Sequence, residues 1–404
     1  MARYKYSGRD RSGKRQGTVY ANSKRDAMSK LKDGGIRVIE MTETPETLLT
    51  KDISIGSPVK LQHFVIYLRQ FATLLKAGVT VVEATVILAF QTESKGLKKA
   101  LFSVEQDLRE GNSLSVAVSK HKKIFSPMFI NMVKAGEVSG NIDDTLERLA
   151  DHFEKQNYTR QKIVSALTYP MVIGVIAIAV VIFLLVAVVP TFVDMFDDLG
   201  GQLPAITRFV LAASEFMQSF WWLVAIIIIS FILLLMYLNK NKKAKYHLDY
   251  ILLRMPIFGI MLQKAAIARM MRTLSSLFSS SVPILQAMSI VEKVVENEVI
   301  AKVIRESRNS LEQGRSMTEP MKSHWAFPPL VTQMIAIGEE TGALDAMLSK
   351  IAEFYEKEVE TGTDRLKSLI EPLMIVVLAA LVGTIVTSIM VPMFEMFNQF
   401  EKKY

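Results

Sequence analysis

The opening segment of the chain contains a sequence that resembles a nucleotide-binding motif. Gly8 and Gly13-Lys14 have the spacing of the phosphate-binding loop GxxxxGK[ST], but Arg15 stands where that loop needs the hydroxyl that ligates magnesium. No long apolar strand precedes the glycines, and no helix is expected to begin at Lys14. We therefore interpret this segment as a β-hairpin turn and expect that any ATP that drives this protein is hydrolysed by another chain.

Side chains that could carry out catalysis or bind a metal are few and scattered. Cysteine is absent, which excludes disulfides, zinc–thiolate sites and a thiol nucleophile. The histidines show no HxxxH or HExxH spacing, and no GxSxG elbow is present. We therefore predict a non-enzymatic protein with no catalytic residue, no metal site and no cofactor. The histidines are His63, His121, His152, His247 and His324.

Three uncharged apolar blocks dominate the composition of the 404-residue chain. Half of its residues are hydrophobic and the mean hydropathy is +0.26. Each block reaches the roughly 20 residues with which a helix crosses a bilayer. The expected fold class is therefore an all-α integral membrane protein with three transmembrane helices. The blocks are Ile163–Val193, Phe216–Asn239 and Pro372–Phe394.

The distribution of charge predicts how the chain is oriented in the membrane. Residues 1–162 carry a net charge of +9, whereas residues 194–215 carry −3. Basic residues near the ends of spans stay on the cytoplasmic side. We therefore expect a multi-pass membrane protein with its N-terminus in the cytoplasm and its C-terminus outside. No patch of interleaved aromatic and basic residues indicates a nucleic-acid partner.

The chain contains the same unit twice. RQFATLLKAGVTVVEA begins at Arg69 and RTLSSLFSSSVPILQA at Arg272, and FSPMFINMVKAGEVSG at Phe125 aligns with FPPLVTQMIAIGEETG at Phe327. The offset stays at 202–203 residues, which indicates an internal duplication. Apolar residues at helical spacing, with breaks at Gly and Pro, predict about six helices per copy, arranged as a bundle.

These features divide the chain into a small α+β unit, two duplicated cytoplasmic helical bundles and three spans. Residues 1–41 are expected to form a β-β-α-β unit. The second span returns the second bundle to the cytoplasm. The expected boundaries are 1–57 for the N-terminal unit and linker, 58–164 for the first bundle, 165–193 for the first span, 194–215 for an external loop, 216–239 for the second span, 240–367 for the second bundle, 368–394 for the third span and 395–404 for an external tail.

A Gly-Glu-x-x-Gly sequence ends an apolar helix in each copy. One alternative is a turn between helices in which the glycines supply positive φ or close packing. That alternative does not explain why a glutamate recurs at the same position, so a partner contact at these turns is the second alternative. The residues are Gly136, Glu137 and Gly140 in the first copy and Gly338, Glu339 and Gly342 in the second.

One ionisable residue lies at the cytoplasmic mouth of the third span. Glu371 is either a functional group within a span or an interface residue that pairs with Lys367 one turn earlier. The near absence of other charges in the apolar blocks argues against an ion or proton pathway.

Prolines and small residues in the apolar blocks are expected to serve the packing of the spans. Pro170 and Pro372 are expected to mark where helices enter the bilayer, because a proline at a helix start needs no donor. Ala379, Gly383 and Thr387 form a stripe at i, i+4 and i+8. Such stripes let helices approach closely, so we expect packing within or between copies here.

Several of these motifs resemble one family. GEVSG and GEETG, Tyr169-Pro170 and Glu371-Pro372, and the Val-Pro pairs ending at Pro190 and Pro392 resemble the inner-membrane platform protein of type IV pilus and type II secretion machines. The opening YKYSGRDRSGKRQGTVYANSKRDAMSKLKDGG resembles the small N-terminal domain of that family. The resemblance covers nearly the whole chain.

The resemblance implies a scaffold rather than an enzyme. Its cytoplasmic domains would engage a hexameric cytoplasmic assembly ATPase, and its motion would lift pilin or pseudopilin subunits from the bilayer into a fibre. Other inner-membrane assembly proteins, membrane lipid and a second copy of the chain are the further partners expected. Glu371 would be a candidate receiver for the N-terminal amine of a pilin.

The residues alone leave a second function open. A small membrane transporter, or a transporter subunit, could be built on the same duplicated scaffold, although transporters normally show more spans with polar or broken midplane segments. The resemblance itself does not choose between a pilus, a competence filament and a secretion pseudopilus.

Overall fold

The computed structural model describes residues 2–10, 13–21, 24–33, 36–43, 58–192 and 204–403. The chain divides into two units, Met1–Pro58 and Val59–Tyr404. The expected fold class is confirmed, since the described residues form a small α+β unit, two duplicated helical bundles and three helices apolar and long enough to cross a membrane. Most of the linker after residue 43 and the first part of the expected external loop lie outside the described residues.

The first unit is a three-stranded antiparallel sheet with one helix. The central strand β1 (Ala2–Asp10) pairs with β2 (Gly13–Ala21) and with β3 (Arg37–Glu43), and α1 (Lys24–Asp33) connects β2 to β3. Asp10 lies opposite Gly13 in the β1–β2 ladder. The nucleotide-like motif therefore forms a β-hairpin, as expected, and its tip at residues 11–12 lies outside the described part of the chain. The core of the unit consists of Tyr4, Ala27, Leu31 and Met41.

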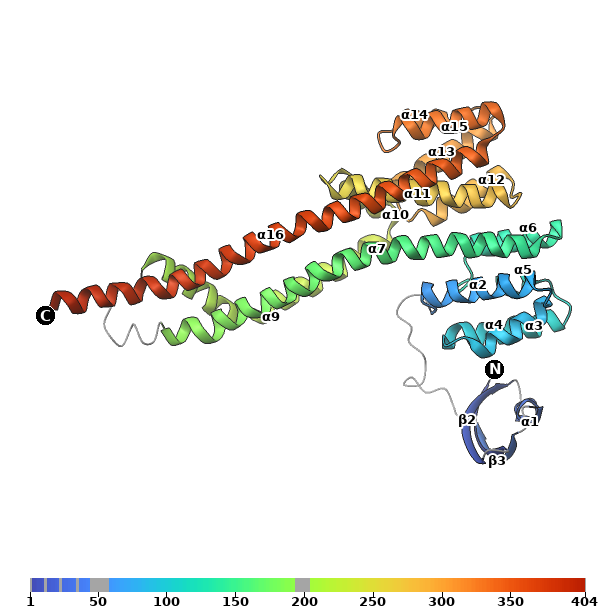
Figure 1. Cartoon of the computed structure of the whole chain (residues 1–404), viewed down its shortest axis with the longest axis horizontal. Helices are drawn as coiled ribbons and strands as arrows, with labels where there is room; N and C mark the ends of the chain where they lie inside the picture. The colour runs from blue at the N-terminus through green and yellow to red at the C-terminus, as the bar shows by residue number, and fades with distance from the viewer. Residues whose placement is uncertain are drawn as a thin grey trace. The chain divides into compact units, whose positions relative to one another are not determined.

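The second unit contains the two bundles (Figure 1). Between residues 58 and 183, which are all described, six helices form the first copy, as its Gly and Pro breaks predict. Thr80, Ser94, Ser113 and Ser126 cap four of them by accepting a hydrogen bond from the backbone N–H three residues on. The helices are α2 (Leu61–Lys76), α3 (Val81–Gln91), α4 (Lys95–Arg109), α5 (Leu114–Ser119), α6 (Pro127–Ser139) and α7 (Ile142–Phe183).

The second copy repeats this helix order and adds one helix at its start. A long apolar helix, α9, leads into the additional helix α10, and the next six helices correspond to α2–α7. One hydrophobic core extends through both copies. The helices are α9 (Ala205–Lys240), α10 (Lys242–Arg254), α11 (Phe258–Ser279), α12 (Ile284–Val294), α13 (Glu298–Glu312), α14 (Thr318–Lys322), α15 (Pro329–Thr341) and α16 (Leu344–Lys403).

The helices α7 and α16 carry the bundles into the apolar segments without a break (Figure 1). The helical segments that contain these two candidate spans are 51 residues each, Ile142–Phe192 and Leu344–Phe394, and the third candidate span is Trp222–Asn239. Pro170 and Pro372 lie inside the long helices, so the expectation that they mark helix starts is wrong. Each proline removes one backbone donor, and the remaining turns keep the hydrogen bonds that a helix needs at a membrane.

An arginine and a glutamate join α2 to α7 in the first bundle and α11 to α16 in the second. Arg69 and Glu154 form two hydrogen bonds of 2.6 Å, and Arg272 and Glu356 form two of 2.8 Å. Bidentate pairs of this kind are stronger than single contacts. These bonds raise the pKa of both arginines and lower the pKa of Glu154. The two arginines occupy aligned positions in the repeat, and their glutamate partners, which were not predicted from the sequence, also recur 202 residues apart.

The two bundles contact each other where α7 meets α11 and α16. His152 Nδ1 lies 3.1 Å from Ser276 Oγ, and Arg148 donates to the carbonyl of Ser279. His152 is buried. Burial, together with the nearby charge of Arg272, lowers the pKa of His152 to about 3, so its ring is neutral at pH 7.

Further along the two long helices, Glu360 on α16 connects them. Its carboxylate pairs with Lys357 at 2.9 Å and Lys162 at 3.0 Å and accepts from the hydroxyl of Tyr158 at 3.1 Å. These hydrogen bonds lower the pKa of Glu360 to about 2. Tyr158 and Glu360 are 202 residues apart, so the two copies meet here at equivalent positions.

The apolar helices contact one another at the end remote from the bundles. There the backbone makes a π-helical turn, η1 (Leu184–Val188), and the buried hydroxyl of Ser214 donates to the Leu185 carbonyl at 2.5 Å. Away from this end few residues of the apolar helices are buried by the rest of the chain, and in the segment Trp222–Asn239 no residue is buried. The cluster that joins η1, α9 and α16 consists of Leu185, Val189, Val210 and Ile385.

Replacing Gly136 by Ala should destabilise the first bundle. An added Cβ would lie 2.6 Å from Thr145 Oγ1, and overpacking of this kind costs about 1–3 kcal/mol. The melting temperature of the full chain in detergent, followed by circular dichroism, should fall. The matched control is Gly362→Ala, since a Cβ there has nothing within 4 Å, and this variant should melt at the wild-type temperature or higher. Equal melting temperatures for the two variants would contradict the packing described here.

Lowering the pH from 7 to 5 should destabilise the interface between the bundles through His152. The unfolded chain binds a proton on this residue below pH of about 6.5, whereas the folded chain does not until pH falls to about 3. Stability should therefore fall with pH across this window, by about 2 kcal/mol at pH 5. In His152→Asn, which cannot take up the proton, the difference between the melting temperatures at pH 7 and pH 5 should shrink. An unchanged difference would contradict the assignment.

Candidate functional site at the bundle turns

The glycines of the repeated Gly-Glu-x-x-Gly sequence form two similar turns between helices. Gly140 ends α6 and Gly342 ends α15 in the left-handed conformation, with φ of +75° and +70°. Gly136 and Gly338 are buried. An added Cβ on Gly338 would lie 3.0 Å from the backbone of α16, much as one on Gly136 would meet α7. The glycines therefore serve the turn and its packing, as the first alternative expects.

The repeated glutamates bind the backbone of the short helix that precedes each turn. Glu137 accepts hydrogen bonds from the Ser115 N–H at 3.2 and 3.3 Å, and Glu339 accepts one from the Met317 N–H at 3.0 Å. Both N–H groups lie at the beginning of a short helix, α5 or α14, where backbone donors lack a partner within the helix. This role could not be predicted from the sequence, because in each copy the bond joins residues 22 apart on consecutive helices, across the connection between them.

These internal contacts change which part of the turn a partner could meet. Glu137 and Glu339 are only partly exposed and already hydrogen-bonded, whereas Val138 is 84% exposed and Glu340 is exposed. A partner contact at the turns stays a prediction. If it occurs, it would involve residues 138–140 and 340–342 more than the two glutamates.

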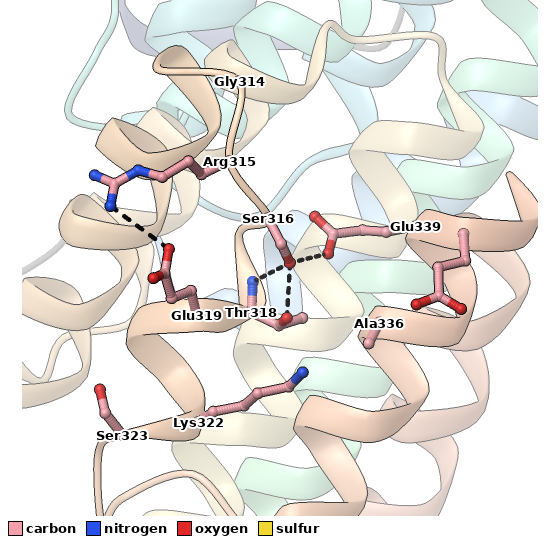
Figure 2. A pocket seen from close by; sticks show the side chains of 10 residues that line it. Gly314, Arg315, Ser316, Thr318, Glu319, Lys322, Ser323, Ala336 and Glu339 are labelled. Carbon is pink, nitrogen blue, oxygen red and sulfur yellow. Dashed lines mark hydrogen bonds and ion pairs between the residues drawn. The ribbon is translucent and has the colours of Figure 1, made fainter.

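An open hollow of about 770 Å³ lies beside Glu339, between α14 and α15 (Figure 2). The Ser316 hydroxyl donates to Glu339 Oε2 at 2.5 Å and accepts from the Thr318 N–H at 3.1 Å. Ser316 thus caps α14 rather than standing ready as a nucleophile. Arg315 pairs with Glu319 at 3.7 Å. The lining contains Gly314, Arg315, Ser316, Thr318, Glu319, Lys322, Ser323, Ala336, Glu339 and Glu340.

The chemistry available in this hollow is limited. Three carboxylates and two cations line it, so neither sign of charge is concentrated enough to favour an ionic ligand. No histidine lines it. Across the described residues no group of three or more His, Asp or Glu side chains is placed to hold a metal ion.

The residues singled out in the third span lie on the outside of the chain. Glu371 is exposed and, within the described residues, forms no ion pair with Lys367, so the pairing considered from the sequence is not present. Ala379, Gly383 and Thr387 are exposed on α16, and a Cβ on Gly383 would meet nothing within 4 Å. The stripe therefore does not pack against the described part of the same chain. Packing between chains stays a prediction, as does a role for Glu371.

The fold defines a multi-pass helical membrane protein whose two bundles arose by duplication and continue directly into two of its apolar helices. Residues 67–190 and residues 270–392 each match the family model described as type II secretion system (T2SS), protein F, and residues 1–42 match type II secretion system protein F, N-terminal domain. The chain therefore belongs to the type II secretion system protein F family, which confirms the resemblance seen in its sequence.

Relatives from both kinds of machine match nearly the full length of the chain. It is 38% identical to the type IV pilus assembly protein PilC of Thermus thermophilus, over 98% of this chain and 99% of the relative. It is 33% identical to PilC of Myxococcus xanthus, over 98% and 95%. It is 34% identical to the type II secretion system protein F of Aeromonas hydrophila, over 93% and 98%.

Replacing Glu339 by Ala should loosen α14 while leaving the rest of the bundle intact. The change leaves the Met317 N–H without its acceptor, and loss of a helix cap costs about 1 kcal/mol. Amide hydrogen exchange of residues 314–322 should become several-fold faster. Glu340→Ala is the matched control, because in the part of the chain described Glu340 is exposed and outside the cap. Equal exchange in both variants would show that Glu339 does not stabilise α14.

Proposed function

We propose that this chain is the inner-membrane platform that couples a cytoplasmic assembly ATPase to the insertion of pilin or pseudopilin subunits into a fibre. The relatives named for type IV pilus assembly and for type II secretion support the setting. The proposal treats the chain as a non-enzymatic scaffold, which its membership of the type II secretion system protein F family supports. The hexameric ATPase, the pilins, other inner-membrane assembly proteins and further copies of the chain are its proposed partners.

The observation that carries this proposal is the continuity of α7 and α16. Each helix belongs at one end to the core of a bundle and at the other to an apolar segment, with no loop between them. An α-helix resists bending over many turns, because its backbone hydrogen bonds run in series along the axis. Displacement of a bundle by a partner would therefore be passed to the membrane segment.

The contacts between the two copies add to this argument. Lys155 pairs with Glu356 at 3.5 Å, and Glu360 pairs with Lys162 at 3.0 Å. Both contacts join α7 to α16 on the bundle side of the apolar segments. The two helices would therefore move together, which suits transmission of a displacement better than independent rearrangement of two domains.

The proposed orientation places both bundles in the cytoplasm and the C-terminus outside. The basic residues near the bundle-side ends of the apolar segments support it, among them Lys162, Lys242 and Lys243. In this orientation the bundles are accessible to a cytoplasmic ATPase, and the cluster around Leu185 and Ile385 lies near the outer face.

The transporter alternative receives less support. The 18-residue apolar windows in α7 and α16 are 11% buried and the window Trp222–Asn239 is 0% buried. Spans that cover one another so little within one chain do not enclose a pathway there, whereas transporters bind substrate between closely packed, interrupted helices.

Breaking the continuity of α16 should abolish fibre assembly. Inserting four glycines after Asp364, between the bundle and the apolar segment, adds a flexible joint to the helix at this point. Fibre or secretion yield in a strain that carries this variant should fall to the level of a strain that lacks the protein. Protein level and membrane insertion should stay as in the wild type.

The matched control inserts Ala-Glu-Ala-Lys at the same place, which lengthens the helix by about one turn and keeps it continuous. This variant should retain clearly more assembly than the glycine variant. Wild-type assembly by the glycine variant would overturn the proposed transmission. Gentle cross-linking of the tagged chain in native cells, followed by mass spectrometry, tests the partners separately, and recovery of neither an assembly ATPase nor prepilins would overturn the platform assignment.

A further inference from the structure

The junction between α10 and α11 exposes a run of large apolar side chains. The chain bends by 114° between the two helices, which together are apolar enough to resemble a broken span. We call residues 251–262 the elbow. Seven of its side chains are between 36% and 62% exposed, namely Ile251, Leu252, Met255, Ile257, Phe258, Ile260 and Leu262. Exposed apolar side chains concentrated in one short segment are typical of an interaction site.

The backbone of the elbow is held in a strained shape. Ile257 has φ of +68°, which is costly for a β-branched residue. The Phe258 N–H bonds to the Pro256 carbonyl at 2.8 Å, and a Cβ on Gly259 would lie 2.3 Å from the Leu253 carbonyl oxygen. This tight turn keeps Ile257 and Phe258 at the tip, exposed to the surroundings.

The elbow lies near the beginning of the third span. Arg272 on α11 pairs with Glu356 on α16, and Lys264 pairs with Glu358, so the two helices run antiparallel. Phe258 is level with about residue 370 of α16 when the helical rise is counted from the Arg272–Glu356 pair, and with about residue 364 when it is counted from the Lys264–Glu358 pair. Figure 1 likewise shows the yellow segment that joins α10 to α11 at the end of the second bundle that faces the apolar helices.

Basic side chains flank the elbow. α10 begins three residues after the candidate span Trp222–Asn239, and its first turns contain Lys242, Lys243 and Lys245. Within the described residues none of these three lysines forms an ion pair, and neither does Arg254, which lies over the rings of Tyr250 and Trp325. Cations above an apolar surface complement the anionic headgroups of a cytoplasmic leaflet.

We propose that the elbow inserts its apolar side chains into the cytoplasmic leaflet, with the lysines of α10 on anionic headgroups, and so attaches the second bundle to the lipid surface. Three observations favour lipid over a protein partner. The elbow lies near the level at which the third span begins, lysines of α10 flank it, and α10 follows the second span almost directly. The proposal needs the bundles on the cytoplasmic side but is independent of which fibre the platform serves. It makes the second bundle a membrane-attached body.

The absence of native cysteine allows a direct test. Ile257→Cys and Ile260→Cys, each labelled with an environment-sensitive fluorophore, are reconstituted as the full chain in vesicles of phosphatidylcholine with and without phosphatidylglycerol. Quenching by lipids brominated along the acyl chain reports insertion, and quenching by iodide reports exposure to water. The matched control is Val138→Cys, an exposed apolar position on the first bundle.

The proposal expects several-fold stronger quenching by brominated lipid at residues 257 and 260 than at residue 138, and the reverse for iodide. Phosphatidylglycerol should increase the lipid quenching, and Lys242→Gln with Lys243→Gln should remove that increase. Equal quenching by iodide at all three positions would overturn the proposal. Protection of residues 257 and 260 from iodide that appears only at high protein density in the vesicle would also overturn it, because the elbow would then contact a second copy of the chain. Ile251→Cys provides an independent position if a label at the tip disturbs the fold.

Discussion

A backbone that passes through a bilayer must keep its hydrogen bonds within its own helix, and the architecture of this chain depends on that constraint. The two helices that satisfy it, α7 and α16, do not begin at the membrane but inside the bundles. Each therefore has an apolar stripe packed in the bundle core and an apolar surface on all sides further along. The ion pairs Arg69–Glu154 and Arg272–Glu356 hold α2 and α11 against these long helices. Each bundle and its span are therefore one continuous body.

The parts of this fold that could be predicted from the sequence are those with a local or periodic cause. The duplication, the six helices of each copy and the three apolar segments follow from spacing and composition, and the left-handed turns follow from Gly140 and Gly342. Pro170 and Pro372 show the opposite case. A proline favours a helix start, but the cost of one lost hydrogen bond is smaller than the cost of ending a helix beside a bilayer.

The contacts that could not be predicted join residues distant in the sequence. Glu137 and Glu339 recur visibly, but their acceptor role depends on where α5 and α14 come to lie. The bond between His152 and Ser276 depends on how two copies of one unit pack side by side. Duplication explains why each bundle has the same internal bonds, and it leaves the surface between the bundles to residues that differ between the copies.

The length of α16 has a geometric consequence. Sixty residues in one helix span about 90 Å, with a bundle at one end and an apolar segment toward the other. A rod of that length that pivots by about 5° at its bundle end carries its tip sideways by about 8 Å, more than the rise of a full helical turn. Modest tilts at the bundle would thus become displacements at the far end of the apolar segment that exceed one helical turn, obtained by leverage alone.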